Sequence, residues 1–228
     1  MKTAPQSHLR YPLTRLLGTE AGVRVLRELA LHGEELTTSL LARRTGITDQ
    51  SVRNALAVLG RAGVLRTYGQ GRAASYQLDA SHPVAGMLIT LFRAEDQRIP
   101  ALYASIRQAA ERLPFPPLAV WMFGSAARHQ DDMQSDLDLL LIVADAEETE
   151  RLADAFRDEL AGVENEQRIT ISVVPLSADD VLRLARDDDP FWRAVTTDAV
   201  ALHGPRPEGL LATLKRGRRA TASRGGTG

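Results

Sequence analysis

The stretch that most constrains this chain is 120–143, VWMFGSAARHQDDMQSDLDLLLIV. It contains two apolar runs, and between them lie a Gly-Ser pair and an Asp-x-Asp triplet. Each run has the length and composition of a short buried strand. The first stops at Gly124-Ser125, where small residues let the backbone approach a phosphate closely. The second follows Asp136-x-Asp138 directly. Because strand side chains alternate between faces, we expect both carboxylates to point the same way.

The two carboxylates predict a cation site. Two acidic groups on one face of an apolar strand are costly to desolvate unless a cation neutralises them. Mg²⁺ suits such a site, because it takes one or two carboxylates and completes its shell with water and phosphate oxygens. Backbone N–H groups after Gly124 would attract the phosphates. The alternative is a strand–turn–strand unit whose aspartates are loop residues without chemistry.

The spacing within this stretch is also that of a known motif. Gly124-Ser125, ten residues and then Asp136-x-Asp138 resembles the signature of the polymerase-β-type nucleotidyltransferase superfamily, and most of all its minimal nucleotidyltransferases. Three residues between the two pairs fit the family's pattern: Ala127, Arg128 and Ser135. His129 departs from it, because a glycine commonly follows that arginine.

The resemblance implies a small mixed sheet flanked by helices, with Mg²⁺ on Asp136 and Asp138. It also implies a nucleoside triphosphate, by expectation ATP, held by four residues: Gly124, Ser125, Arg128 and Ser135. The family carries a third carboxylate on a later strand. The matching run here is ITISVV at 169–174, and it places Ser172 at that position.

Ser172 leaves two interpretations open. A hydroxyl cannot act as a general base near neutral pH, and it binds Mg²⁺ more weakly than a carboxylate. Glu164 or Glu166 from the preceding loop, or His129, could take its place. With Asp136, Asp138 and Ser172 as the catalytic positions, the domain transfers a nucleotidyl group to a protein or small-molecule hydroxyl. Alternatively it is catalytically silent and senses nucleotide or serves as a scaffold.

The first eighty residues predict three helices followed by a hairpin. Apolar residues recur at helical spacing over 21–32, 38–45 and 49–63, and Thr48 is a suitable N-cap for the third helix. Two short strands then enclose a basic, glycine-rich tip at 69–72. This order resembles the winged helix-turn-helix of MarR- and ArsR-type bacterial regulators.

This resemblance implies binding of double-stranded DNA and regulation of transcription. Four residues of the third helix would face the major groove: Gln50, Ser51, Arg53 and Asn54. Three arginines would contact phosphates: Arg43, Arg44 and Arg72. Residues 1–80 contain 11 Lys and Arg against 6 Asp and Glu, which favours a polyanionic partner. The alternative is a winged helix that only contacts protein or dimerises.

The predicted fold class is α+β, in four parts. A DNA-binding domain (1–80) is followed by a helical connector (81–113), divided or kinked at Pro100, that could support a homodimer or dock on the second domain. The nucleotidyltransferase-like domain (114–205) comes next, and a basic, disordered tail (206–228) ends the chain. The family includes antitoxins that modify a toxin, so a protein acceptor of that kind is a candidate partner.

Composition narrows the location and excludes some site classes. The chain has no cysteine, which excludes disulfides, thiolate metal sites and a cysteine nucleophile. The N-terminus lacks an apolar signal core, and no apolar run approaches membrane-spanning length. We therefore expect a cytoplasmic protein with no membrane contact.

Overall fold

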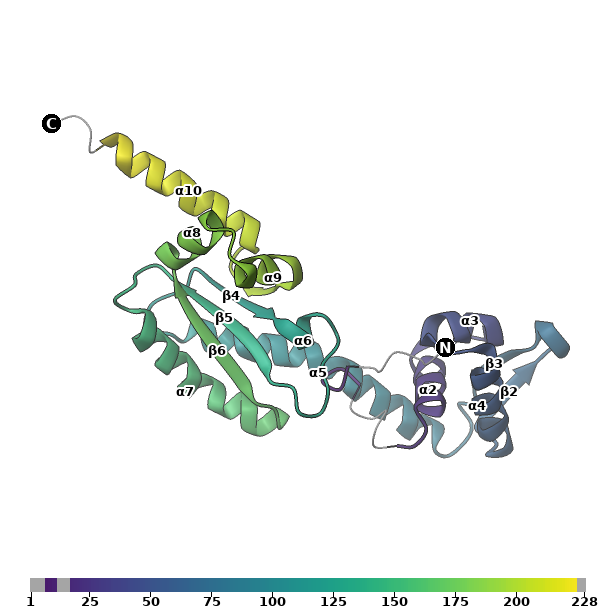
Figure 1. Cartoon of the computed structure of the whole chain (residues 1–228). Helices are drawn as coiled ribbons and strands as arrows, with labels where there is room; N and C mark the ends of the chain where they lie inside the picture. The colour runs from purple at the N-terminus through teal and green to yellow at the C-terminus, as the bar shows by residue number, and fades with distance from the viewer. Residues whose placement is uncertain (1–6, 12–16, 225–228) are drawn as a thin grey trace. The chain divides into compact units, whose positions relative to one another are not determined.

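The computed structural model of the chain describes residues 7–11 and 17–224. It divides into two compact units, Met1–Ile99 and Pro100–Gly228, each with its own helices and its own sheet (Figure 1). The predicted α+β fold class is confirmed. The division falls inside helix α5 (Ala85–Glu111), which covers most of the predicted connector and contains Pro100 without ending there. The functions assigned to the predicted domains stay predictions.

The first unit contains the three helices and the hairpin that the sequence predicts. The helices are α2 (Glu20–His32), α3 (Thr38–Thr45) and α4 (Asp49–Arg61). Each begins after a threonine N-cap whose hydroxyl accepts a backbone N–H of the first turn: Thr19, Thr37 and Thr48. The antiparallel sheet has the order β1-β3-β2 and consists of β1 (Leu36–Thr37), β2 (Leu65–Tyr68) and β3 (Ser75–Leu78).

The helices of this unit pack around a core that fixes which face of α4 is exposed. Val52 and Leu56 of α4 are buried against Leu29 of α2 and Leu41 of α3. The opposite side of α4 therefore remains at the surface. A short 3₁₀ helix, η1 (Gly71–Ala73), forms the tip of the hairpin between β2 and β3.

The second unit is a mixed four-stranded sheet of order β6-β5-β4-β7. Its strands are β4 (Ala119–Phe123), β5 (Leu137–Val143), β6 (Ile171–Ser177) and β7 (Val200–His203). The central strand β4 pairs antiparallel with both neighbours, whereas β5 and β6 run parallel. Parallel neighbours need a long crossover, and α7 (Thr149–Gln167) provides it.

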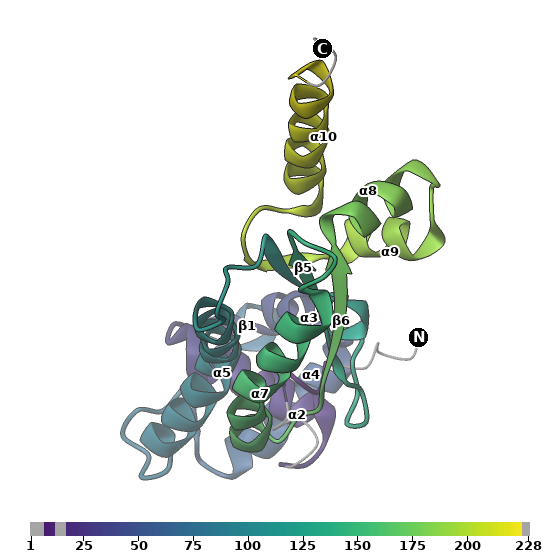
Figure 2. The same cartoon turned by 90° about the vertical axis from the view of Figure 1, so that its left-hand side faces the viewer.

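Helices cover both faces of this sheet (Figure 2). The face that carries Leu140 and Ile142 of β5 packs against α8 (Ala178–Arg186), α9 (Pro190–Asp198) and the first turns of α10 (Pro207–Arg224). Trp121 of β4 anchors this layer, since its ring lies 6.0 Å from that of Trp192 and its Nε1 donates to Pro205 O at 2.8 Å. Asp138 belongs to the same face of β5, two residues before Leu140.

Two sequence-based expectations are wrong in this unit. Residues 207–224 of the tail predicted to be disordered form α10 instead, because Leu210, Leu211 and Leu214 recur at helical spacing and pack on α8 and α9. The arginine-rich composition of α10 concealed that pattern. Residues 225–228 of that predicted tail lie outside the described residues. Glu164 and Glu166, expected in a loop, lie on the last turn of α7.

Candidate functional site

Strand pairing brings the Gly-Ser turn against the second aspartate. Phe123, the last residue of β4, pairs with Asp138 of β5, and Gly124 follows with φ +74°. A Cβ added at Gly124 would lie 2.3 Å from Asp138 Oδ2. The carboxylate therefore rests on the glycine backbone, at a point where a side chain would collide with it. Helix α6 (Gly124–Ala127) begins at the same glycine.

Asp136 and Asp138 form a negatively charged pair. Asp136 is exposed immediately before β5, and Asp138 is half-buried on the strand. Burial raises the pKa of Asp138, the charge of Asp136 raises it further, and Arg128 lowers it. All three side chains are thus within electrostatic reach of one another. A bound cation would remove the cost of keeping both carboxylates ionised.

The donor set fits Mg²⁺ only if other oxygens complete its shell. Within residues 7–11 and 17–224, no three His, Cys, Asp or Glu side chains gather in a way that could hold a metal ion. The protein would supply the two aspartates, and water and substrate phosphates the rest, which is a common arrangement for Mg²⁺.

Arg128 is held beside the aspartate pair by a residue that no sequence motif identifies. Arg128 Nη1 lies 2.7 Å from Oδ2 of Asp198, the last residue of α9, and its Nε donates to Gln130 Oε1 at 3.1 Å. Asp198 lies 70 residues away in sequence, outside any motif, so only the packing of α9 could identify it.

The two serines predicted to bind nucleotide differ in their surroundings. Ser125 is half-buried in α6, directly after Gly124. The hydroxyl of Ser135 accepts the backbone N–H of Asp132 at 2.9 Å and donates to Asp132 Oδ1 at 3.1 Å. Ser135 thus closes the loop before the aspartates. Contact of either serine with nucleotide stays a prediction.

Ser172 lies beside Asp138 in the sheet. The two residues are register partners on the parallel strands β5 and β6, so their side chains share a face. Glu164 is committed elsewhere, because its Oε1 accepts the backbone N–H of Ile171 at 2.7 Å. His129 is exposed and has φ 60°, the left-handed conformation that favours glycine.

The predicted base-reading residues share the exposed side of α4. Gln50, Arg53 and Asn54 are exposed and bonded to one another, with Gln50 Nε2 donating to Asn54 Oδ1 at 2.9 Å and Arg53 Nη2 donating to Gln50 Oε1 at 3.2 Å. Ser51 is half-buried, and its hydroxyl lies 2.9 Å from that of Thr48. The structure thus brings these positions together, while their contact with DNA stays a prediction.

The three arginines predicted to contact phosphates differ in their surroundings. Arg43 is exposed on α3. Arg44 is paired with Glu28 of α2, at 2.7 Å between Nε and Oε2. Arg72 belongs to η1 at the tip of the hairpin, and its side chain lies outside the described part of the chain. Of the three arginines, Arg44 thus already has an acidic partner.

Comparisons with known proteins give little further information. No family model matches the sequence, and neither does a curated protein. A toxin–antitoxin structure with AMP-PNP is 16% identical, with 54% of this chain and 90% of that chain covered and a TM-score of 0.35. TrmBL2, an archaeal chromatin protein with a novel mode of DNA binding, is also 16% identical, with coverages of 78% and 74% and a TM-score of 0.29. At TM-scores this low, neither likeness establishes a fold or a function for this chain.

Among the helices that the structure describes, none has the length and apolar composition to cross a membrane.

Proposed function

We propose that this protein binds double-stranded DNA through its first unit and a magnesium–nucleoside triphosphate, by expectation ATP, through its second. The contact of the Asp138 carboxylate with Gly124, with Asp136 nearby, carries the nucleotide half of this proposal. The contact brings a glycine backbone that can approach a phosphate next to two acidic groups, whose charge Arg128 offsets only in part. The DNA half makes the protein a candidate regulator of transcription.

Each residue near the turn has a distinct role in this proposal. Asp136 and Asp138 hold the ion, and the backbone at Gly124 and Ser125 approaches the triphosphate, where the side chain of Ser125 adds a hydroxyl. Arg128, positioned by Asp198, adds a positive charge beside the phosphates. Ser135 keeps the loop closed around them. The bound Mg²⁺ would neutralise triphosphate charge.

The position of Ser172 favours a nucleotide sensor over a transferase. The residue beside Asp138 carries a hydroxyl in place of the family's third carboxylate, and a hydroxyl cannot accept a proton from an incoming hydroxyl at neutral pH. The second candidate function is nucleotidyl transfer to a protein hydroxyl, such as one of a toxin, or to a small molecule. The aspartate pair favours this candidate, because phosphoryl and nucleotidyl transfer depend mostly on positioning and charge neutralisation.

Calorimetry with Mg-ATP and a labelled-nucleotide transfer assay separate these functions. We expect the wild type to bind Mg-ATP without transfer, and Asp138→Ala to lose the binding. Ser172→Asp should gain transfer. Ser172→Asn should not, because asparagine has nearly the shape of aspartate but cannot accept the proton. Transfer by the wild type that Asp138→Ala abolishes would favour the enzyme, and absence of Mg-ATP binding would leave the second unit as a scaffold.

The DNA half has its own measurement. Binding to duplex DNA should weaken steeply as salt is added, because each phosphate contact releases a counterion. Salt-insensitive or absent binding would contradict the DNA half of the proposal.

DNA and ATP as partners imply a cytoplasmic protein. Light scattering would test the predicted homodimer.

A further inference from the structure

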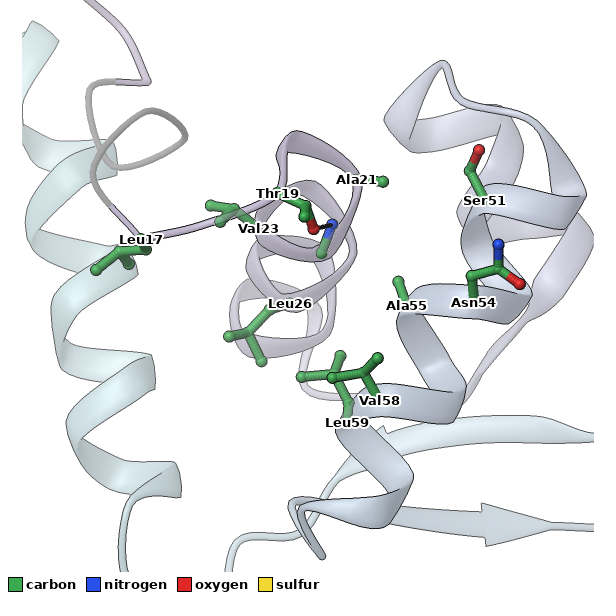
Figure 3. A pocket seen from close by; sticks show the side chains of 11 residues that line it. Leu17, Thr19, Ala21, Val23, Leu26, Ser51, Asn54, Ala55, Val58 and Leu59 are labelled. Atoms are coloured by element: carbon green, nitrogen blue, oxygen red, sulfur yellow. Dashed lines mark hydrogen bonds between the residues drawn. The ribbon is translucent and has the colours of Figure 1, made fainter.

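A hollow of about 580 Å³ opens in the first unit, between α2 and α4 (Figure 3). Leu26 of α2 and Val58 and Leu59 of α4 line its apolar end, and Thr19, Ser51 and Asn54 lie toward the other end. Val58 is 57% exposed, so apolar side-chain surface at the hollow faces solvent. A space of this volume with mostly apolar walls and a few polar groups is typical of a small-molecule site.

The lining favours a neutral ligand over a charged one. Every residue that lines the hollow is uncharged, and all belong to the described stretch 17–59. The neighbouring Glu20 is already paired with Arg24, at 2.5 Å. An ionic ligand would therefore lose part of its hydration without gaining an ion partner. A neutral molecule loses little, because its apolar body replaces water against Leu26 and Leu59.

The polar end favours a ligand that accepts a hydrogen bond. Asn54 Oδ1 already accepts from Gln50 Nε2 at 2.9 Å. An asparagine amide also has two N–H donors, which can serve an oxygen of a ligand. The oxygen of a ketone, an ester or an amide meets this requirement.

We propose that the hollow binds a neutral, mostly apolar small molecule with one oxygen acceptor, and that this ligand competes with DNA for Asn54. The competition rests on the proposed function, whereas ligand binding itself does not. If a base edge and the ligand both require the amide of Asn54, each lowers the affinity for the other by the same factor. The hollow then makes the DNA affinity of the first unit sensitive to a small molecule.

Three probes that each contain eight carbon atoms test the class of ligand: octan-2-one, octanoate and octylammonium. Each is titrated into the full-length ¹⁵N-labelled protein and followed by NMR. Octan-2-one should give saturable shifts at amides of α2 and α4. The two ions should bind at least about tenfold more weakly. Val58→Trp should fill the hollow and abolish the shifts, whereas Met87→Trp, at a 70% exposed position of α5, should not change them. Asn54→Ala, at an exposed position, should weaken octan-2-one binding without unfolding the unit.

Each other outcome contradicts a defined part of the proposal. No saturable shifts, equal binding of the three probes, or unchanged binding in Val58→Trp would overturn the site. Duplex DNA is then titrated with and without saturating octan-2-one, and its affinity should fall in the presence of the probe. Ligand binding with unchanged DNA affinity would overturn the competition. A chain that binds octan-2-one but no DNA would refute the DNA half of the proposed function and leave the ligand site standing.

Discussion

A methyl group at position 124 would collide with the carboxylate of Asp138. Its Cβ would lie 2.3 Å from Oδ2, and the backbone there has φ +74°. We expect Gly124→Ala to lower the free energy of unfolding by about 1–3 kcal/mol and to abolish Mg-ATP binding, as measured by urea unfolding and calorimetry. Gly162→Ala on α7, where an added Cβ meets nothing within 4 Å, is the matched control. It should stabilise by about 0.5–1 kcal/mol.

Asp138 should make stability depend on pH in an unusual direction for a carboxylate. Burial, and then Asp136, raise its pKa in the folded chain above the ordinary value of 3.8. The stability contributed by the protonated form is thus fully present below the unfolded pKa and is lost as pH rises through the folded one. Asp138→Asn should therefore stabilise the metal-free protein at pH 7, by less than about 1 kcal/mol because solvent screens the half-buried group.

Thermal unfolding of both proteins at pH 7 and near pH 3 measures this effect. The advantage of Asp138→Asn should disappear at the lower pH, and the variant should not bind Mg-ATP. A variant that is less stable than the wild type at neutral pH would show that the carboxylate has a favourable partner.

Local sequence spacing predicts residues of the site that are near one another along two strands, but not residues brought in by helix packing. Gly124 and Asp138 follow from the strand ends that carry them, and Ser172 from the alternation of β6. Asp198 reaches Arg128 only because α9 packs over the sheet through Trp192. The bond of Glu164 to Ile171 likewise depends on where α7 ends.

At the scale of elements, the predictions succeed where capping and apolar periodicity agree. The N-cap Thr48 and the spacing of Val52 and Leu56 predict α4. The glycine-rich tip predicts the hairpin of β2 and β3. The start of α10 could not be predicted in this way, because its few leucines stabilise a helix only by packing on α8 and α9. Pro100 does not divide the connector, because α5 continues through it, and a kink at this residue stays a prediction.

A buried ion pair joins α2 to α5 within the first unit. Arg27 Nε lies 2.7 Å from Glu95 Oε2, and both side chains are under a tenth exposed. Glu95→Gln should cost about 3–5 kcal/mol of unfolding free energy, because the charge of Arg27 would remain buried without its acid. Glu28→Gln breaks the exposed pair with Arg44 of α3 and should cost about 1 kcal/mol or less. Equal effects in urea unfolding would contradict this distinction.

At the scale of the whole molecule, charge is distributed unevenly along the chain. Residues 81–204 contain 11 Lys and Arg against 22 Asp and Glu, whereas the 11 basic residues of 1–80 outnumber 6 acidic ones. We therefore expect DNA to meet the first unit. Arg53→Ala should weaken binding to a preferred site by about 1–3 kcal/mol and to random DNA by less.

Fluorescence anisotropy with both duplexes measures the effect of Arg53→Ala, and Arg151→Ala in the second unit removes the same charge as a control. An equal loss on both duplexes would assign Arg53 to a phosphate contact.

The hydrogen bonds that join Arg53, Gln50 and Asn54 have a thermodynamic consequence. Before DNA arrives, this surface of α4 already satisfies much of its own hydrogen-bonding capacity. Where a base edge takes up Gln50 Oε1 or Asn54 Oδ1, the new bond replaces an old one, so little heat should be released per base pair recognised. Discrimination between sequences would come from how well the rearranged side chains fit, and calorimetry on matched and mismatched duplexes should give similar enthalpies with different affinities.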